Sequence, residues 1–185
     1  MGSEATATTP ISWVDQFRAL HPPESLPQEA RAAFSDLLDH RTAIRDYYAL
    51  FPAERFDEGI EKGDSPKKEL IHQIGNTRVR IDAITSGSLV DWGYNQLDPK
   101  GFSSLQQMDR DRLIGELDSS TEKLFDASSK ANMHGTISLP NGKSSSVGDF
   151  LWGAVRHEAL HLGMAIKFGD YFGIERPASV KKLYG

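Results

Sequence analysis

The sequence predicts an all-α protein built on four long helices, and two observations support this fold class. In four segments, apolar residues recur three or four positions apart, which is the spacing of one face of a helix. No series of segments shows the strict alternation of apolar and polar residues that predicts a sheet. Helices joined by connections of varied length are typical of a bundle. We therefore expect a four-helix bundle with long inter-helix connections and at most one short extended segment.

Proline and glycine mark the ends of the first two helices. The first helix is expected over residues 27–51, because Pro52 cannot continue it. The second helix is expected over residues 66–86. Ser65 is a good cap before a proline at the first helical position, and Gly87 follows the last turn.

The last two helices are separated by a connection that has an extended character. The third helix is expected over residues 109–130, and the fourth starts at Ser145 or Ser146 and runs to about Phe172. Residues 88–108 predict a long connection, and residues 135–142 allow one short extended piece.

The chain of 185 residues is long enough for one domain with its own hydrophobic core. Residues 1–26 are rich in Pro, Thr and Ser and predict an N-terminal tail or packing arm, which Trp13 and Phe17 can anchor. Residues 27–185 then form a single helical-bundle domain.

The composition is that of an ordinary globular protein and excludes several classes of function. A net charge of −5 without a Lys/Arg cluster argues against nucleic acid as a partner. The absence of cysteine excludes disulfides, thiolate catalysis and Cys-based metal sites. No signal peptide and no run as long as a membrane span are visible, so we expect a cytoplasmic protein without a membrane partner.

The fourth helix carries an H-E-x-x-H motif formed by His157, Glu158 and His161. Two imidazoles four residues apart in a helix lie one turn above each other and can bind one metal ion. Both histidines fall inside the apolar stripe of this helix, and Glu158 lies at its edge. The alternative is a pair of core histidines satisfied by their neighbours. The spacing favours a metal site, with Glu158 as a catalytic residue or as part of a salt bridge.

A metal site needs a third ligand, which the helical pattern does not identify. The candidates are His21, His40, His72 and His134. His72 lies on the second helix, but away from its main apolar stripe, so it can line a cavity or face solvent.

Arg41 falls in the middle of the apolar stripe of the first helix. A buried guanidinium needs an anion, which Glu158 or a substrate carboxylate can supply. Arg41 is therefore a candidate substrate-binding residue. The alternative is that its long side chain reaches the surface.

The motif leaves three alternative functions open. In a zinc peptidase Glu158 is the general base, but Lys167 stands where the longer motif has its third histidine, and Glu175 is the only later carboxylate of the right type. A di-iron carboxylate protein is suggested by the pairs Glu69-x-x-His72 and Glu158-x-x-His161, although the first helix offers Arg41 where that class has a glutamate. The third alternative is a bundle that binds a metal or a small ligand without catalysis.

These segments together resemble the DinB/YfiT-like superfamily of four-helix bundles. The second helix matches over residues 65–72, and the fourth over residues 146–152 and 157–163. The extended piece and turn over residues 137–147 are also typical of that family. The resemblance covers most of residues 27–175.

The resemblance implies a metal triad of His72, His157 and His161. It also implies a metal-dependent enzyme that activates a water or thiol to act on a small-molecule substrate, either as a hydrolase or as a thiol S-transferase. The metal is a divalent ion, for which three imidazoles suit Zn, Ni or Fe. A low-molecular-weight thiol as cofactor and a homodimer are further expectations from the family.

Overall fold

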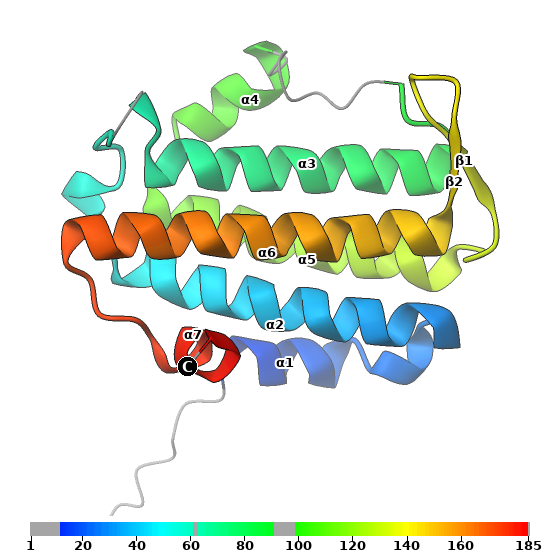
Figure 1. Cartoon of the computed structure of the whole chain (residues 1–185), viewed down its shortest axis with the longest axis horizontal. Helices are drawn as coiled ribbons and strands as arrows, with labels where there is room; N and C mark the ends of the chain where they lie inside the picture. Colours follow the sequence, from blue (N-terminus) through cyan, green and yellow to red (C-terminus); the bar gives the residue numbers. More distant parts are fainter. Residues whose placement is uncertain (1–11, 61–62, 91–98, 185) are drawn as a thin grey trace, which may run out of the picture.

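The computed structural model describes residues 12–60, 63–90 and 99–184, and four long helices lie side by side in it (Figure 1). They are α2 (Gln28–Leu50), α3 (Pro66–Ser86), α5 (Arg110–Lys130) and α6 (Val147–Phe172). The predicted all-α class is confirmed, and each long helix begins and ends within two residues of its expected bounds. No helix within the described ranges is long and apolar enough to cross a membrane.

Helix caps explain why these bounds were predictable. Ser65 and Ser146 each accept a hydrogen bond from the backbone N–H three residues later, which starts α3 and α6. Gly87 and Gly173 follow the same helices with φ of 72° and 70°, a left-handed conformation that glycine adopts without strain. These signals lie in the local sequence.

The long helices pack in pairs, α2 mainly against α6 and α3 mainly against α5. The contact between α3 and α6 is less extensive. In Figure 1, α6 lies between α3 and α2, with α5 behind it. The facing sides of α3 and α6 are therefore less closely packed than the two main pairs. We call the interface between α3 and α6 the seam.

The segment 1–26, expected as a tail or arm, contains α1 (Trp13–Leu20) and a short 3₁₀ turn (Pro23–Ser25). Phe17 is buried, and its ring lies 5.9 Å from that of Phe125 and 6.3 Å from that of Phe34. Trp13 packs against the same cluster. Residues 1–11 lie outside the described residues.

Three further helical elements lie between or after the long helices. They are a 3₁₀ turn (Ala53–Arg55), α4 (Pro99–Gln106) and α7 (Ala178–Tyr184). The expectation of a connection without helix over residues 88–108 is wrong for its second half, which forms α4. Two turns are too short to show a clear helical period in the sequence. Residues 91–98 of that connection lie outside the described residues.

The predicted extended piece is one strand of a small hairpin. Strand β1 (Thr136–Ser138) pairs antiparallel with β2 (Ser144–Ser146), and Gly142 has φ of 73° in the turn between them. The second strand was not expected, because three serines carry almost no strand signal. On its other side β1 bonds the residues after α3: Ser138 N–H donates to Gly87 O at 3.0 Å, and Leu89 N–H donates to Ser138 O at 2.8 Å. The hairpin thus ties the end of α3 to the start of α6.

The core consists of two hydrophobic clusters separated by a buried polar layer. One cluster lies around Phe34, Phe125 and Phe150, and the other around Tyr48, Leu113 and Phe168. Along each long helix, polar residues stand between the stretches that belong to the two clusters. We call these residues the polar layer: Arg41, Gln73, Asn76, Thr77, Arg80, Ser120, Thr121, Glu158 and His161.

Candidate metal centre

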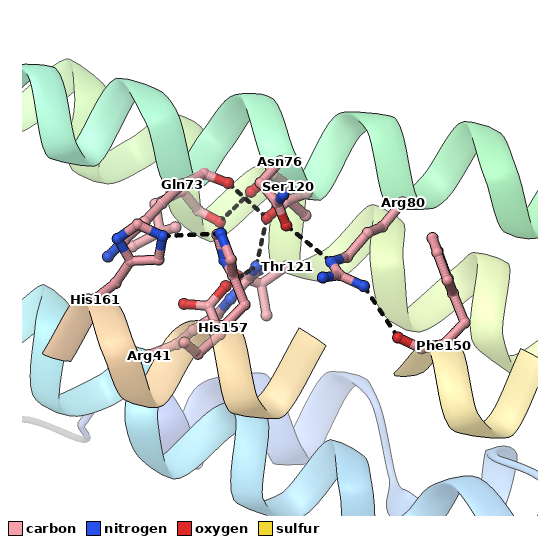
Figure 2. Close-up of polar contacts among 12 residues, drawn as sticks. Arg41, Gln73, Asn76, Arg80, Ser120, Thr121, Phe150, His157 and His161 are labelled. Atoms are coloured by element: carbon pink, nitrogen blue, oxygen red, sulfur yellow. Dashed lines mark hydrogen bonds and ion pairs between the residues drawn. The ribbon is translucent and has the colours of Figure 1, made fainter. Parts of the chain in front are cut away.

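Three histidines meet at the edge of the polar layer, where α3 faces α6. One ring nitrogen from each of His72, His157 and His161 lies within 4.8 Å of the others. The ring centroids of His157 and His161 are 4.2 Å apart, and that of His72 lies 5.5 Å and 5.1 Å from them. Figure 2 shows the two α6 rings turned toward each other, one helical turn apart. Within the described part of the chain, these three side chains form the group that can hold a metal ion.

The other histidine candidates are placed elsewhere. His21 lies against the rings of Phe17 and Phe125 at the α1 end of the molecule. His40 is bonded through Nδ1 to the carbonyl of Asp36 on its own helix, at 2.7 Å. The side chain of His134 is 83% exposed. Of the four candidates, the structure therefore brings only His72 to the pair on α6.

The spacing of the α6 histidines fits two ligands of one ion. Their Nε2 atoms are 3.1 Å apart. Nitrogen ligands about 2.0–2.1 Å from zinc lie about 2.8–3.4 Å from each other at right-angled to tetrahedral geometry. The same distance suits a hydrogen bond from one ring to the other, which a bound cation would replace.

Glu69 on α3 orients one of the three rings. The Nδ1 atom of His161 lies 2.7 Å from Glu69 Oε1, and the His161 side chain is only 4% exposed. Donation of the Nδ1 proton to this carboxylate leaves the lone pair on Nε2, toward the other two histidines. The E-x-x-H spacing of Glu69 and His72 indicated a shared helix face, but it did not identify His161 as the partner of Glu69.

Burial keeps the imidazoles of His72 and His157 neutral. Burial, with the charges of His161 and Arg80 nearby, lowers the pKa of His157 to about 3. Burial and His161 also lower the pKa of His72. Metal ions bind the deprotonated form of imidazole, so these two side chains are ready to bind a cation at neutral pH.

Arg41 and Glu158 form a buried ion pair beneath the histidines. Arg41 Nη2 donates to Glu158 Oε1 at 2.8 Å, and the two side chains are 1% and 3% exposed. The guanidinium also donates to Thr121 Oγ1 at 2.6 Å and to the hydroxyl of Thr77 (Figure 2). Arg41 therefore has the anion that its position required, and the alternative that it reaches the surface is wrong.

Several buried polar atoms beside this ion pair accept or donate no hydrogen bond within the described residues. They are Glu158 Oε2, the hydroxyl of Tyr48 and both side-chain polar atoms of Gln73. Burial, with the nearby charges of Glu69 and Glu158, raises the pKa of Tyr48 well above its usual value. Buried polar groups normally have partners, so these atoms mark a polar interior next to the histidines.

The additional carboxylates that the peptidase and di-iron alternatives would need lie elsewhere. Glu175, the downstream candidate of the peptidase alternative, is at the surface and forms an ion pair with Lys181 at 2.7 Å. The di-iron alternative would also need a glutamate from α5, but Glu116 of that helix pairs with Arg78 at 2.8 Å. Neither joins the group of potential ligands that the described residues form.

Comparison of the chain with protein-family models, with curated proteins and with solved structures finds no match. The resemblance drawn from the sequence motifs therefore stays a prediction, and the functional argument depends on the site itself.

Proposed function

We propose that this protein is a metal-dependent enzyme of the DinB/YfiT-like type that binds one divalent metal ion through His72, His157 and His161. The observation that supports this best is the convergence of the three imidazoles from α3 and α6. The spacing of His157 and His161 and the hydrogen bond that His161 donates to Glu69 add to it. The four long helices and the hairpin before the last of them agree with the proposed family.

The proposed reaction class is hydrolysis, or the transfer of a thiol, on a small-molecule substrate. A zinc, nickel or iron ion held by neutral imidazoles lowers the pKa of a water or thiol that binds to it, which makes either a nucleophile near neutral pH. The protein side chains have two further roles in this proposal. They hold the three imidazole rings in place, and they accept the proton that the water or thiol releases.

Glu158 is the proposed proton acceptor. Its Oε1 atom is held by Arg41, while Oε2 has no hydrogen-bond partner among the described side chains. A carboxylate fixed through one oxygen presents the other in a constant direction, which is what a general base requires. In this proposal Arg41 positions Glu158, and its earlier assignment to substrate binding stays a prediction.

Metal analysis of the purified protein and its variants tests the proposal. We expect one equivalent of divalent metal per chain, and loss of stoichiometric binding in His157→Ala and in His161→Ala, because each change removes one of three ligands. His134→Ala is the matched control, because His134 is exposed and far from the group. Unchanged metal content in a folded double variant of His157 and His161 would overturn the proposal.

A further inference from the structure

Two guanidinium groups approach the same point on α6, one turn before His157. The point is Gly153, which has no side chain to fill the space. A β-carbon on Gly153 would lie 3.5 Å from Nη1 of Arg80 and 3.9 Å from Nη2 of Arg156. Like charges that approach one point repel each other, and a bound anion between them relieves this repulsion.

Arg80 is built into the polar layer and has a fixed orientation. It is 5% exposed, its Nε donates to Asn76 Oδ1 at 2.8 Å, and its Nη1 donates to Phe150 O at 3.0 Å (Figure 2). The guanidinium carbon also lies 5.0 Å from the centre of the Phe150 ring. A cation held in this way is preorganised to bind an oxyanion.

Arg156 supplies the mobile half of the same site. Its side chain is exposed on α6, and within the described ranges no hydrogen bond or ion pair holds its guanidinium. It can therefore turn toward a ligand without breaking an internal contact. A planar guanidinium matches a carboxylate in a two-point contact.

This pair of arginines lies in the same seam as the three histidines. Gly153 is four residues before His157, which is about 6 Å along the helix axis. On α3, Arg80 follows His72 by eight residues, and it faces Phe150 and Gly153 on α6. A small molecule that reaches the histidines with one end can therefore reach the arginines with the other.

We propose that Arg80 and Arg156, which meet beside Gly153, form a binding subsite for the carboxylate of a small-molecule ligand whose other end binds the metal. This inference rests on the proposed function. It specifies the substrate class as a small molecule that carries a carboxylate a few bonds from its metal-binding atom.

The test uses protein loaded with Co(II), whose visible absorption reports both metal uptake and the binding of a thiolate. Two probes of equal chain length are titrated, 3-mercaptopropionate and 3-mercapto-1-propanol, which differ in the carboxylate. We expect the carboxylate probe to bind about tenfold more tightly, as expected for a charge-assisted contact to a guanidinium.

Two substitutions should abolish this preference without loss of Co(II) uptake. Arg156→Gln removes an exposed guanidinium, and Gly153→Asp places a carboxylate of the protein between the two arginines. The matched controls on the same helix are Lys167→Gln and Gly163→Asp. Gly163 has no atom within 4 Å of a β-carbon added there. Both controls should keep the preference of the unmodified chain.

The possible failures are distinguishable. Absence of Co(II) uptake would overturn the metal centre and the subsite together. Normal uptake with equal affinity for the two thiols would overturn only the subsite. The same conclusion follows if Arg156→Gln and Gly153→Asp both keep the preference for 3-mercaptopropionate.

Discussion

At the scale of single residues, the site depends on groups that do not belong to the H-E-x-x-H motif. His161 is oriented by Glu69 from the neighbouring helix, at 2.7 Å. Glu158 is held by Arg41 from a third helix, at 2.8 Å. Groups from two other helices therefore fix two side chains of the motif: the carboxylate of Glu69 orients the His161 ring, and the guanidinium of Arg41 holds the Glu158 carboxylate.

Substitution of Glu69 tests the orienting role of its carboxylate. We expect Glu69→Gln to weaken metal binding by about 10- to 100-fold, because an amide is a poorer acceptor for the His161 ring. Competition with a chelator of known affinity measures the change. Glu116→Gln, in a half-exposed ion pair with Arg78, is the control and should bind metal normally. Equal affinity in both variants would show that Glu69 does not orient the ligand.

The pH dependence of stability tests the buried state of His157. Its pKa is lowered to about 3 in the folded protein and returns to about 6.5 on unfolding. Between these values the unfolded chain binds more protons than the folded one. The free energy of unfolding of metal-free protein should therefore fall as the pH falls below 6.5, by at most about 1.4 kcal/mol per pH unit from this group.

Urea unfolding with a chelator present, at pH 5, 6 and 7, measures this slope. In His157→Leu the slope should decrease but persist in part, because the pKa of His72 is lowered in the same direction. Replacement of the exposed His134 should leave it unchanged. If His157→Leu does not change the pH dependence of the unfolding free energy, the lowered pKa of His157 is not its cause.

At the scale of secondary-structure elements, α6 has contacts of two kinds. It packs closely on α2 at its C-terminal end, where a β-carbon on Gly169 would overlap the hydroxyl oxygen and the ring of Tyr47. At its centre it faces α3 through polar groups. The close contact with α2 anchors the helix, and the looser one with α3 leaves room for the site.

Two glycines of α6 give a matched pair of substitutions. Gly169→Ala should destabilise the protein by about 1–3 kcal/mol, because the Tyr47 ring has to move. Gly163→Ala should stabilise it by up to about 1 kcal/mol, because nothing lies within 4 Å and alanine favours the helix. Unfolding in urea gives both values. The same sign for both substitutions would contradict the close packing of α2 and α6.

The elements differ in how far the sequence predicted them. The long helices were predictable because their caps, prolines and glycines are local signals, as at Ser65 and Gly87. Helix α4 and the serine strand β2 were not, because each is short and stabilised by its neighbours. The pair on α6 was predictable from its spacing. The position of His72 and the partner of Glu69 depend on how α3 packs against α6. The residue pattern of a single helix does not predict that packing.

At the scale of the whole molecule, the polar layer divides the hydrophobic core, and the three histidines lie at one edge of it. The ion pair of Arg41 and Glu158 lies within this layer and links α2 to α6. The histidines link α6 to α3. A metal ion at the histidines would therefore hold together two helices whose direct contact is otherwise limited.

Thermal unfolding tests this link. A ligand that binds only the folded state at 100 times its Kd adds about 2.7 kcal/mol of stability. We expect a chelator to lower the Tm by several degrees, and re-addition of metal to restore it. In His72→Ala, which keeps only the ligands on α6, metal should have little effect. A Tm that rises equally with metal in His72→Ala would show that the ion does not bridge the two helices.

The hairpin between α5 and α6 has a consequence for how this chain can vary in length. Because β1 is bonded both to β2 and to the residues that follow α3, it sets where α6 begins relative to α3. An insertion at the Gly142 turn would lengthen a surface loop and leave the histidines where they are. An insertion of one residue between Ser146 and His157 would turn both α6 rings by about 100° away from His72. Homologous chains with the same site should therefore vary in the length of this turn, but keep a constant interval from the serine cap to the first histidine.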